Sequence, residues 1–251
     1  MAVEKVALIT AGGTGVAAAT ARRLAEDGFQ VGILSSSGKG EALAQELGGV
    51  GVTGSSQCLA DLGRLVDLAQ ARWGRVDVLI NSTGHEPRAP LLSLADERWL
   101  QGTDTYLQSV IRPTRLVAPL MQAQRGGVIV NLSSAWAVDP SALFPTAALV
   151  RAGLASFTRI FVDSYSRHNI RMNNVLPGWI DTLPVWEERR TAVPLQRYGQ
   201  AAEVAATIAF LASEGAGYIN GQNLRVDGGL ALAPRVPPQR AGWRGCPTPP
   251  P

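Results

Sequence analysis

The fold of this chain is decided by the stretch VALITAGGTGVA, residues 6–17. Residues 6–9 are all apolar with no alternation, which predicts a short strand that is buried on both faces. A helical pattern starts at Ala17, directly after the turn with Gly12, Gly13 and Gly15. A strand, a glycine-rich turn and a helix in this order direct backbone N–H groups toward a phosphate. Because glycine clusters occur in turns of many kinds, the turn alone is a weak signal.

Outward from this stretch, strands and helices alternate along the chain. Further unalternated runs at 76–80 and 127–132 predict buried strands, as do shorter patterns at 31–34, 170–176 and 222–226. Helical patterns cover 17–27, 59–73, 96–124, 151–167 and 201–213. This alternation predicts an α/β, doubly wound parallel sheet of about seven strands, Rossmann-like and three-layered, in a single domain.

Length and composition agree with one domain that acts on small molecules. The chain has 251 residues, 46% of them hydrophobic, which suffices for one large core at residues 1–232. Residues 233–251 are rich in Pro and Arg and predict a disordered tail. The net charge of +3 is spread along the chain, so we expect a small-molecule substrate, no nucleic acid and no membrane partner.

The cysteines and the first residues exclude further classes of protein. Cys58 and Cys246 have no companions at metal-ligand spacing, so we expect neither a metal nor a disulfide framework, and we expect Cys58 to be buried. The apolar run before Ala11 is too short for a signal peptide or a membrane span, which favours a cytoplasmic enzyme.

The first turn resembles that of the short-chain dehydrogenase/reductase family, whose loop at this place is Thr-Gly-x-x-x-Gly-x-Gly. Thr10 and Gly15 match this pattern, whereas Ala11 and Ala17 occupy the places of the first and third glycines. Each alanine adds a methyl group where the backbone approaches a cofactor closely, so we expect weaker affinity or a displaced loop, with Gly12 and Gly13 supplying the lost freedom.

Further segments carry the resemblance from Val3 to about Leu230. Asn81-Ser82-Thr83-Gly84 is similar to the family's Asn-Asn-Ala-Gly, and Pro177-Gly178-Trp179-Ile180-Asp181-Thr182 is similar to its Pro-Gly-x-Ile-x-Thr. The resemblance implies a nicotinamide cofactor. Its predicted contacts are Thr10, Gly12, Gly13, Thr14, Gly15, Val16, Ser35, Ser36, Ser37, Lys39, Asn81, Ser82, Gly84, Arg151, Pro177, Gly178, Ile180 and Thr182.

The residues after the second strand favour NADP over NAD as this cofactor. Ser35-Ser36-Ser37-Gly38-Lys39 has no acidic residue to accept a hydrogen bond from a ribose 2′-hydroxyl. Hydroxyls with Lys39 instead suit a 2′-phosphate, although the segment is also compatible with a plain polar loop. Ser55, where the family usually has an aspartate near the adenine, is a further departure.

The catalytic residues that the resemblance implies are only partly present. The family uses a serine, a tyrosine that transfers the proton, and a lysine four residues after the tyrosine that lowers its pKa. Ser134 takes the place of the serine, although a serine after a strand is often only a helix cap. Arg151 stands at the lysine position and Ala147 at the tyrosine position.

Tyr106 stands where the family has an asparagine that assists catalysis. We predict that Tyr106 faces the pocket beside Ser134, with Arg151 near enough to lower its pKa from about 10. Arginine does not relay a proton at ordinary pH, so Arg151 acts as an electrostatic partner or as a clamp for a carboxylate or ribose. The alternative is that Tyr106 only packs in the core.

Other residues near the predicted pocket have weaker signals. His85 and Glu86 follow Gly84 and are candidates for an acid and its partner, although a loop histidine is more often solvated. Trp136, Trp179 and Trp186 predict an aromatic-lined mouth or simple packing.

Three functions stay open at this stage. The first is an NADP-preferring oxidoreductase that transfers a hydride between nicotinamide and a carbonyl or alcohol. The second is a non-redox enzyme on the same fold, such as a lyase, isomerase or dehalogenase, because dehalogenases resembling this family carry arginine in the lysine position. The third is a non-catalytic nucleotide-binding subunit. In each case the resemblance implies a homo-oligomer, a tetramer or dimer.

Overall fold

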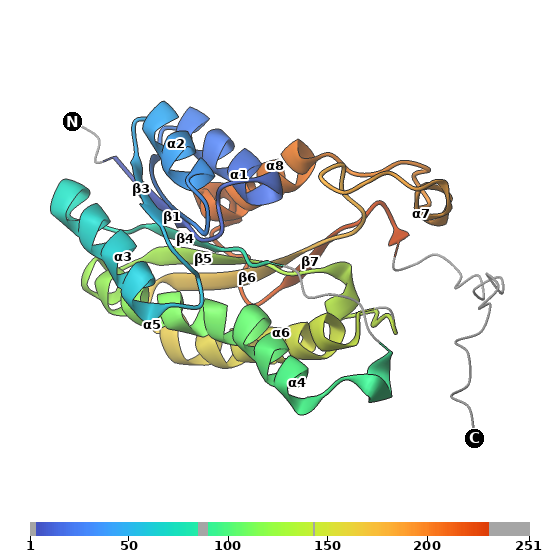
Figure 1. The fold of residues 1–251 in the computed structure, drawn as a ribbon. Helices are drawn as coiled ribbons and strands as arrows, with labels where there is room; N and C mark the ends of the chain where they lie inside the picture. Colours follow the sequence, from blue (N-terminus) through green and yellow to red (C-terminus); the bar gives the residue numbers. More distant parts are fainter. Residues whose placement is uncertain (1–3, 85–89, 143, 231–251) are drawn as a thin grey trace, which may run out of the picture.

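A seven-stranded parallel sheet forms the centre of the molecule (Figure 1), within a computed structural model that describes residues 4–84, 90–142 and 144–230. The strand order is β3-β2-β1-β4-β5-β6-β7, which confirms the predicted doubly wound fold. The strands are β1 (Val6–Ile9), β2 (Gln30–Ser35), β3 (Val50–Thr53), β4 (Val78–Asn81), β5 (Gly127–Leu132), β6 (Ile170–Pro177) and β7 (Asn223–Val226). The order reverses between β1 and β4, and ligands of such sheets bind in the crevice at this switch point.

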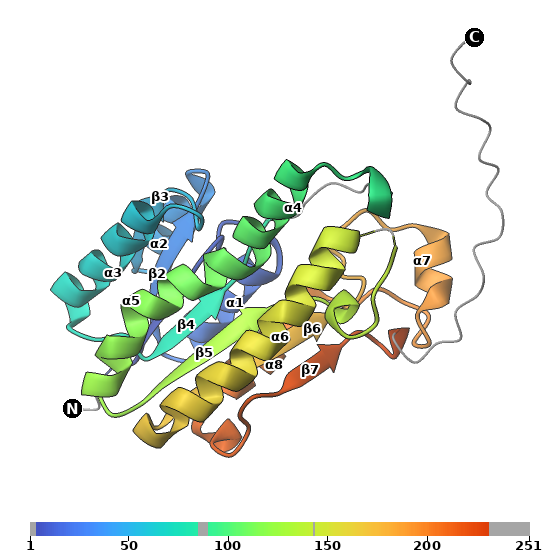
Figure 2. The same ribbon diagram turned by 90° about the horizontal axis from the view of Figure 1, so that it is seen from below.

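Helices cover both faces of the sheet (Figures 1 and 2). One face carries α1 (Gly15–Glu26), α2 (Lys39–Glu46) and α8 (Ala201–Ala212). The other face carries α3 (Leu59–Trp73), α4 (Asp96–Thr103), α5 (Ser109–Ala123) and α6 (Pro145–Tyr165). The short helix α7 (Glu187–Ala192) lies beyond the carboxyl end of β6, apart from both layers.

Each strand contributes side chains to two separate hydrophobic cores. In β1, Ala7 and Ile9 pack with α1 and α8, whereas Val6 and Leu8 pack with α3 and α5. Successive side chains of a strand point to opposite faces, so a sheet covered on both sides needs unbroken apolar runs. This is why the strands lack the alternation of a half-exposed sheet.

The predicted helix at 96–124 is interrupted in the structure. A π-helical turn, η2 (Asp104–Gln108), separates α4 from α5 and contains Tyr106. Helix α6 begins at Pro145, before the predicted start at Arg151, because proline suits the first turn of a helix. Sequence patterns also missed β3, α2 and α7, which are short elements with weak apolar periodicity.

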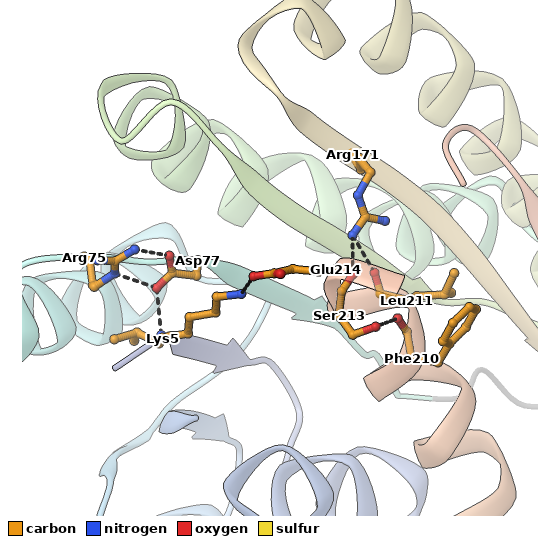
Figure 3. A network of polar contacts seen from close by, with 9 residues as sticks. Lys5, Arg75, Asp77, Arg171, Phe210, Leu211, Ser213 and Glu214 are labelled. Carbon is orange, nitrogen blue, oxygen red and sulfur yellow. Dashed lines mark hydrogen bonds and ion pairs between the residues drawn. The ribbon is translucent and has the colours of Figure 1, made fainter. Parts of the chain in front are cut away.

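Buried arginine Arg171 ties the end of α8 to the sheet (Figure 3). Its Nη2 donates to the carbonyls of Leu211 at 2.9 Å and Ser213 at 3.2 Å, and Nη1 donates to Ile219 at 3.3 Å. Burial lowers the pKa of Arg171, whereas the negative end of the helix dipole favours its charge. Nearby, Lys5 pairs with Glu214 at 3.1 Å.

Several predictions fall outside the described residues or are corrected. The predicted tail at 233–251, which includes Cys246, lies outside the described residues, and so do His85 and Glu86. The expectation that Cys58 is buried is wrong, because Cys58 is exposed at the start of α3. Among the described residues, no helix has the length and apolarity needed to span a membrane.

Candidate active site

A cavity of about 1040 Å³ opens at the carboxyl ends of the strands. This volume is at the upper end of the range for small-molecule sites. The lining comes from the β1–α1 turn, the loops after β2, β3, β4 and β5, the first turns of α6, and residues 177–183 after β6. Segments far apart in sequence therefore meet at the predicted switch point.

The turn after β1 is fixed by hydrogen bonds to the neighbouring strands. Thr10 Oγ1 donates to the carbonyl of Ser82 at 3.0 Å and accepts from the N–H of Ser82, also at 3.0 Å. The N–H of Gly12 donates to the carbonyl of Leu34 at 2.9 Å. Thr10 and Gly12 do not line the cavity. They hold the turn in place between β2 and β4.

Ala11 and Gly15 carry the left-handed conformations of this turn, with φ of 49° and 62°. The expectation that Gly12 and Gly13 supply the freedom lost at Ala11 is wrong, because neither has a positive φ. They are glycines because of close packing. A Cβ on Gly12 would lie 2.7 Å from Ile33 Cγ2, and one on Gly13 would lie 2.5 Å from Ser35 Oγ.

The N-terminus of α1 faces the cavity without a side-chain cap. The N-cap residue Thr14 makes no side-chain capping hydrogen bond, and the first turn contains no acidic residue. Thr14, Gly15, Val16 and Ala17 all line the cavity. The first N–H groups of a helix have no partner within the helix, so this end suits an anion such as a pyrophosphate. The dinucleotide implied by the sequence therefore fits this site.

The loop after β2 brings serines, but not Lys39, to the cavity. Ser35, Ser36 and Ser37 line it, and the buried Ser35 hydroxyl donates to the carbonyl of Ser37 at 3.1 Å. Lys39 is exposed at the first residue of α2 and does not line the cavity.

A chain of asparagines, three of them buried and Asn223 exposed, links four strands below the cavity. Asn81 Nδ2 donates to Asn131 Oδ1 at 2.9 Å, Asn131 donates to Asn174 at 2.9 Å, and Asn174 donates to Asn223 at 2.8 Å. Asn81 is fully buried and does not line the cavity, whereas Ser82 and Gly84, which follow it, do. The structure thus places Asn81 in support of the loop.

Ser134, Tyr106 and Arg151 line the same cavity, together with Ala147. Ser134 follows β5 and caps a single 3-10 turn, where its Oγ accepts from the N–H of Trp136 at 3.3 Å. An acceptor bond of this kind leaves the hydroxyl proton for another acceptor. Tyr106 comes from the π-helical turn and is 2% exposed. The three residues predicted from the sequence to share a site therefore line one cavity.

Arg151 is a buried cation, 5% exposed, on the second turn of α6. Its guanidinium carbon lies 4.5 Å from the centre of the Tyr106 ring. Nη1 donates to the carbonyl of Leu132 at 3.0 Å, and Nη2 donates to Thr83 Oγ1 at 3.4 Å. Burial lowers the pKa of Arg151 to about 10, and the interaction with the Tyr106 phenol opposes this shift.

The wall near residues 177–183 is aromatic. Trp179 lies 5.7 Å from Trp136 and 6.4 Å from Phe144, measured between ring centres, and all three line the cavity. Arg189 on α7 also lines the cavity and lies over the rings of Trp179 at 4.2 Å and Trp186 at 3.9 Å. Sequence reasoning found the tryptophans but missed Arg189, since nothing in the pattern distinguished it from neighbouring Arg190.

Pro177, Gly178, Ile180 and Thr182 complete the cavity on this side. Gly178 permits close backbone packing, because a Cβ there would lie 2.9 Å from the Cα of Asp227. A Cβ on Gly15 would lie 3.7 Å from Thr182 Cγ2, so the segment after β6 reaches the α1 end of the cavity. Among the described residues, no group of three potential metal ligands occurs.

Comparisons with known proteins agree with this geometry. Residues 10–231 match the family model described as enoyl-(acyl carrier protein) reductase. The chain is 33% identical over 247 residues to the 3-oxoacyl-(acyl-carrier-protein) reductase of Thermotoga maritima, covering 91% of this chain and 98% of the relative. It is 31% identical to the Staphylococcus aureus enzyme of the same name, covering 92% and 100%.

A solved structure is also similar to this chain over most of its length. The crystal structure of acetoin dehydrogenase from Enterobacter cloacae superimposes with a TM-score of 0.86 and 29% sequence identity, covering 94% of this chain and 99% of that one. All these relatives are named as reductases or dehydrogenases. The comparisons therefore favour redox chemistry over the non-redox and non-catalytic alternatives.

Proposed function

Since this chain belongs to the short-chain dehydrogenase/reductase family, it is an NAD(P)-dependent oxidoreductase, and we propose that Ser134, Tyr106 and Arg151 form its catalytic group. The observation that carries the proposal is their convergence on one cavity, with Arg151 over the Tyr106 ring. Ala147 lines the same wall where the family's tyrosine is expected, so a phenol from η2 takes the place of one from α6.

The cofactor supplies or accepts a hydride at its nicotinamide ring. Its pyrophosphate fits the uncapped N-terminus of α1, and its adenosine ribose fits the loop with Ser36 and Ser37. Pro177, Gly178, Ile180 and Thr182 are proposed to hold the nicotinamide end, on the side of the cavity where Trp179 lies.

The protein's own groups complete the transfer of a proton. Ser134 donates a hydrogen bond from its hydroxyl to the substrate oxygen and so positions the carbonyl. In the reducing direction Tyr106 gives the carbonyl oxygen a proton as the alcohol forms, and in the oxidising direction it takes that proton back. The charge of Arg151 above the ring stabilises the phenolate that remains, and its donors are close enough to the cavity to hold a ribose hydroxyl.

Replacement of Tyr106 by phenylalanine tests this assignment. Loss of a general acid lowers kcat by about a hundredfold to ten-thousandfold, while affinity for the nucleotide changes little. Tyr165→Phe is the matched control, because Tyr165 stacks on Phe161 at 4.5 Å at the far end of α6 and does not line the cavity. Full turnover in Tyr106→Phe would leave that phenol with a packing role only.

The preference for NADP over NAD is a proposal supported by the loop after β2. Ser35, Ser36 and Ser37 line the cavity, and this part of the lining contains no carboxylate to repel a 2′-phosphate. Lys39 is exposed and does not line the cavity, so we expect the serines to contribute most to binding of the 2′-phosphate. Calorimetry with both nucleotides tests the preference, and a Ser37→Asp variant should reverse it through charge repulsion.

A homo-oligomer, a dimer or tetramer, is also proposed. Leu149 and Ile160 are 63% and 66% exposed on α6 and fall on the same helical face at a spacing of three turns. An exposed apolar face of this kind is typical of subunit contacts. Light scattering on the purified protein measures the oligomeric state. We retain a cytoplasmic location as a proposal, which fractionation of cells tests.

A further inference from the structure

The described lining of the cavity carries positive charge and contains no acidic residue. Among the described residues that line it, the only charged ones are Arg151 and Arg189. Arg151 belongs to the catalytic group, deep in the wall, whereas Arg189 comes from α7 at the aromatic side. A cavity with one sign of charge and poorly solvated walls concentrates ligands of the opposite sign.

The guanidinium carbon of Arg189 lies over two tryptophan rings, and no described residue accepts a hydrogen bond from its N–H groups. Within the described part of the chain it makes contacts with the Trp179 and Trp186 rings but no hydrogen bond or ion pair. The five N–H donors of a guanidinium lie in its plane, so a contact through the face leaves them available. A carboxylate is the usual bidentate partner of such a fork.

The neighbouring residue on α7, Arg190, has partners for its guanidinium within the protein. Its Nη2 pairs with Glu187 at 2.5 Å, and its Nη1 donates to the carbonyl of Gln196 at 2.7 Å. Arg190 does not line the cavity. Two adjacent arginines on α7 therefore differ in role, since one stabilises the helix and the other faces the cavity.

Trp179 joins Arg189 to an aromatic surface. The ring of Trp179 contacts Arg189 on one side of the cluster and lies within stacking or edge distance of Trp136 and Phe144. A flat apolar ring in the ligand would bury its faces against this cluster. The cation and the aromatic surface are contiguous, so one small molecule can use both.

We propose that the substrate of this site is an aromatic or similarly flat carbonyl compound that bears a carboxylate, with Arg189 as the residue that selects the carboxylate. The inference deepens the proposed redox function and rests on it for the carbonyl. The carboxylate lies on Arg189, the ring on the Trp136, Phe144 and Trp179 cluster, and the carbonyl oxygen at Ser134 and Tyr106. In the reducing direction, a C–H bond forms at the carbonyl carbon with a hydride from the reduced nicotinamide, and the C=O π bond breaks. The oxygen takes its proton from Tyr106, which regains one from solvent.

Binding of an unreactive probe pair tests the selection independently of turnover. Calorimetry on the protein saturated with NADP⁺ compares naphthoate with naphthamide, which share a ring system and differ in charge. We expect naphthoate to bind about tenfold to a hundredfold more tightly, as charge-assisted hydrogen bonds to a partly buried arginine do. Higher salt should reduce the difference, because Arg189 is only half-buried.

Variants of the two adjacent arginines locate the effect. Arg189→Gln should bring the two affinities within about threefold of each other, Arg189→Lys should keep part of the preference, and Arg190→Gln should keep all of it. Circular dichroism confirms that each variant is folded. Equal affinities in the unaltered protein, no binding of naphthoate, or an unchanged preference in Arg189→Gln each overturn the proposal.

Titration with NADP⁺ separates this inference from the proposed function. An Arg189→Gln variant that loses affinity for NADP⁺ by the same factor would assign Arg189 to a cofactor phosphate instead. Failure of the unaltered protein to bind either nicotinamide nucleotide at millimolar concentration would refute the redox function. The naphthoate titration without nucleotide would still show whether the cavity selects aromatic carboxylates.

Discussion

Replacing Arg151 by methionine removes a buried charge from the cavity wall while keeping a side chain of similar length. Burial lowers the pKa of Arg151 from its ordinary value to about 10. A shift of this size corresponds to a penalty of about 3 kcal/mol for keeping the charged form in the folded protein. This penalty already includes the opposing interaction with Tyr106. The hydrogen bond that the charged Arg151 donates to Leu132 offsets about 2 kcal/mol of it.

The variant is therefore expected to be more stable than the unaltered protein by about 1 kcal/mol, which raises Tm by about 2–4 °C. At the same time, turnover should fall at least a hundredfold, because the phenolate of Tyr106 loses its stabilising charge. Thermal unfolding without ligand measures the first effect, and nucleotide oxidation with an accepted carbonyl compound measures the second. Stability and activity should change in opposite directions.

The pH dependence of the free energy of unfolding tests whether the charge of Arg151 destabilises the fold. The folded-state pKa of about 10 and the unfolded value both lie above neutral pH, so the penalty is fully present from pH 6 to 9. Above pH 10 the unfolded chain holds the proton more tightly than the folded one, and the penalty declines. The stability gap between variant and unaltered protein should thus be constant from pH 6 to 9. A loss of more than about 1 kcal/mol in Arg151→Met would refute the reasoning.

Three further substitutions test other parts of the fold. Arg171→Met should lose about 2–3 kcal/mol in denaturant unfolding, because it leaves the carbonyls at the end of α8 without donors. Ala11→Gly should gain about 1 kcal/mol in the same assay, since Ala11 has a φ of 49°. Glu203→Gln should be destabilising at pH 7 but not at pH 2 by thermal unfolding. Arg197 and the N–H of Gln200 lower the pKa of Glu203 to about 2, so its contribution is lost as pH falls from its ordinary pKa toward that value.

The sequence predicted the long apolar strands well because burial on both faces leaves an unmistakable pattern. Strands β1 and β5 begin and end at the predicted residues, and so does helix α3. Strand β3 was missed because only Val52 of its four residues is buried, so its sequence shows little hydrophobic periodicity. Local patterns describe burial by a continuous face, and β3 lacks one.

Part of the candidate site could be predicted from the sequence, because residue type and spacing indicate a role for some positions. Ser134 and Arg151 follow from their spacing, and the fold places both on the cavity together with Tyr106. The π-helical turn that carries Tyr106 has no sequence signal, because its i to i+5 hydrogen bonds depend on tertiary packing. Arg189 was missed for a related reason, since only the fold shows that it faces the cavity while Arg190 pairs with Glu187.

The two buried arginines show how the fold separates structural from functional charge. Arg171 donates to the carbonyls of Leu211 and Ser213 at the negative end of α8 and to that of Ile219, so protein groups compensate its charge. Arg151 donates to one carbonyl and one hydroxyl and lines a cavity whose described lining has no carboxylate. Burial lowers the pKa of Arg151 to about 10, and only the interaction with Tyr106 opposes the shift. An anionic group bound in the cavity would supply the missing compensation, so an anionic ligand should stabilise the unaltered protein more than Arg151→Met at the same free ligand concentration.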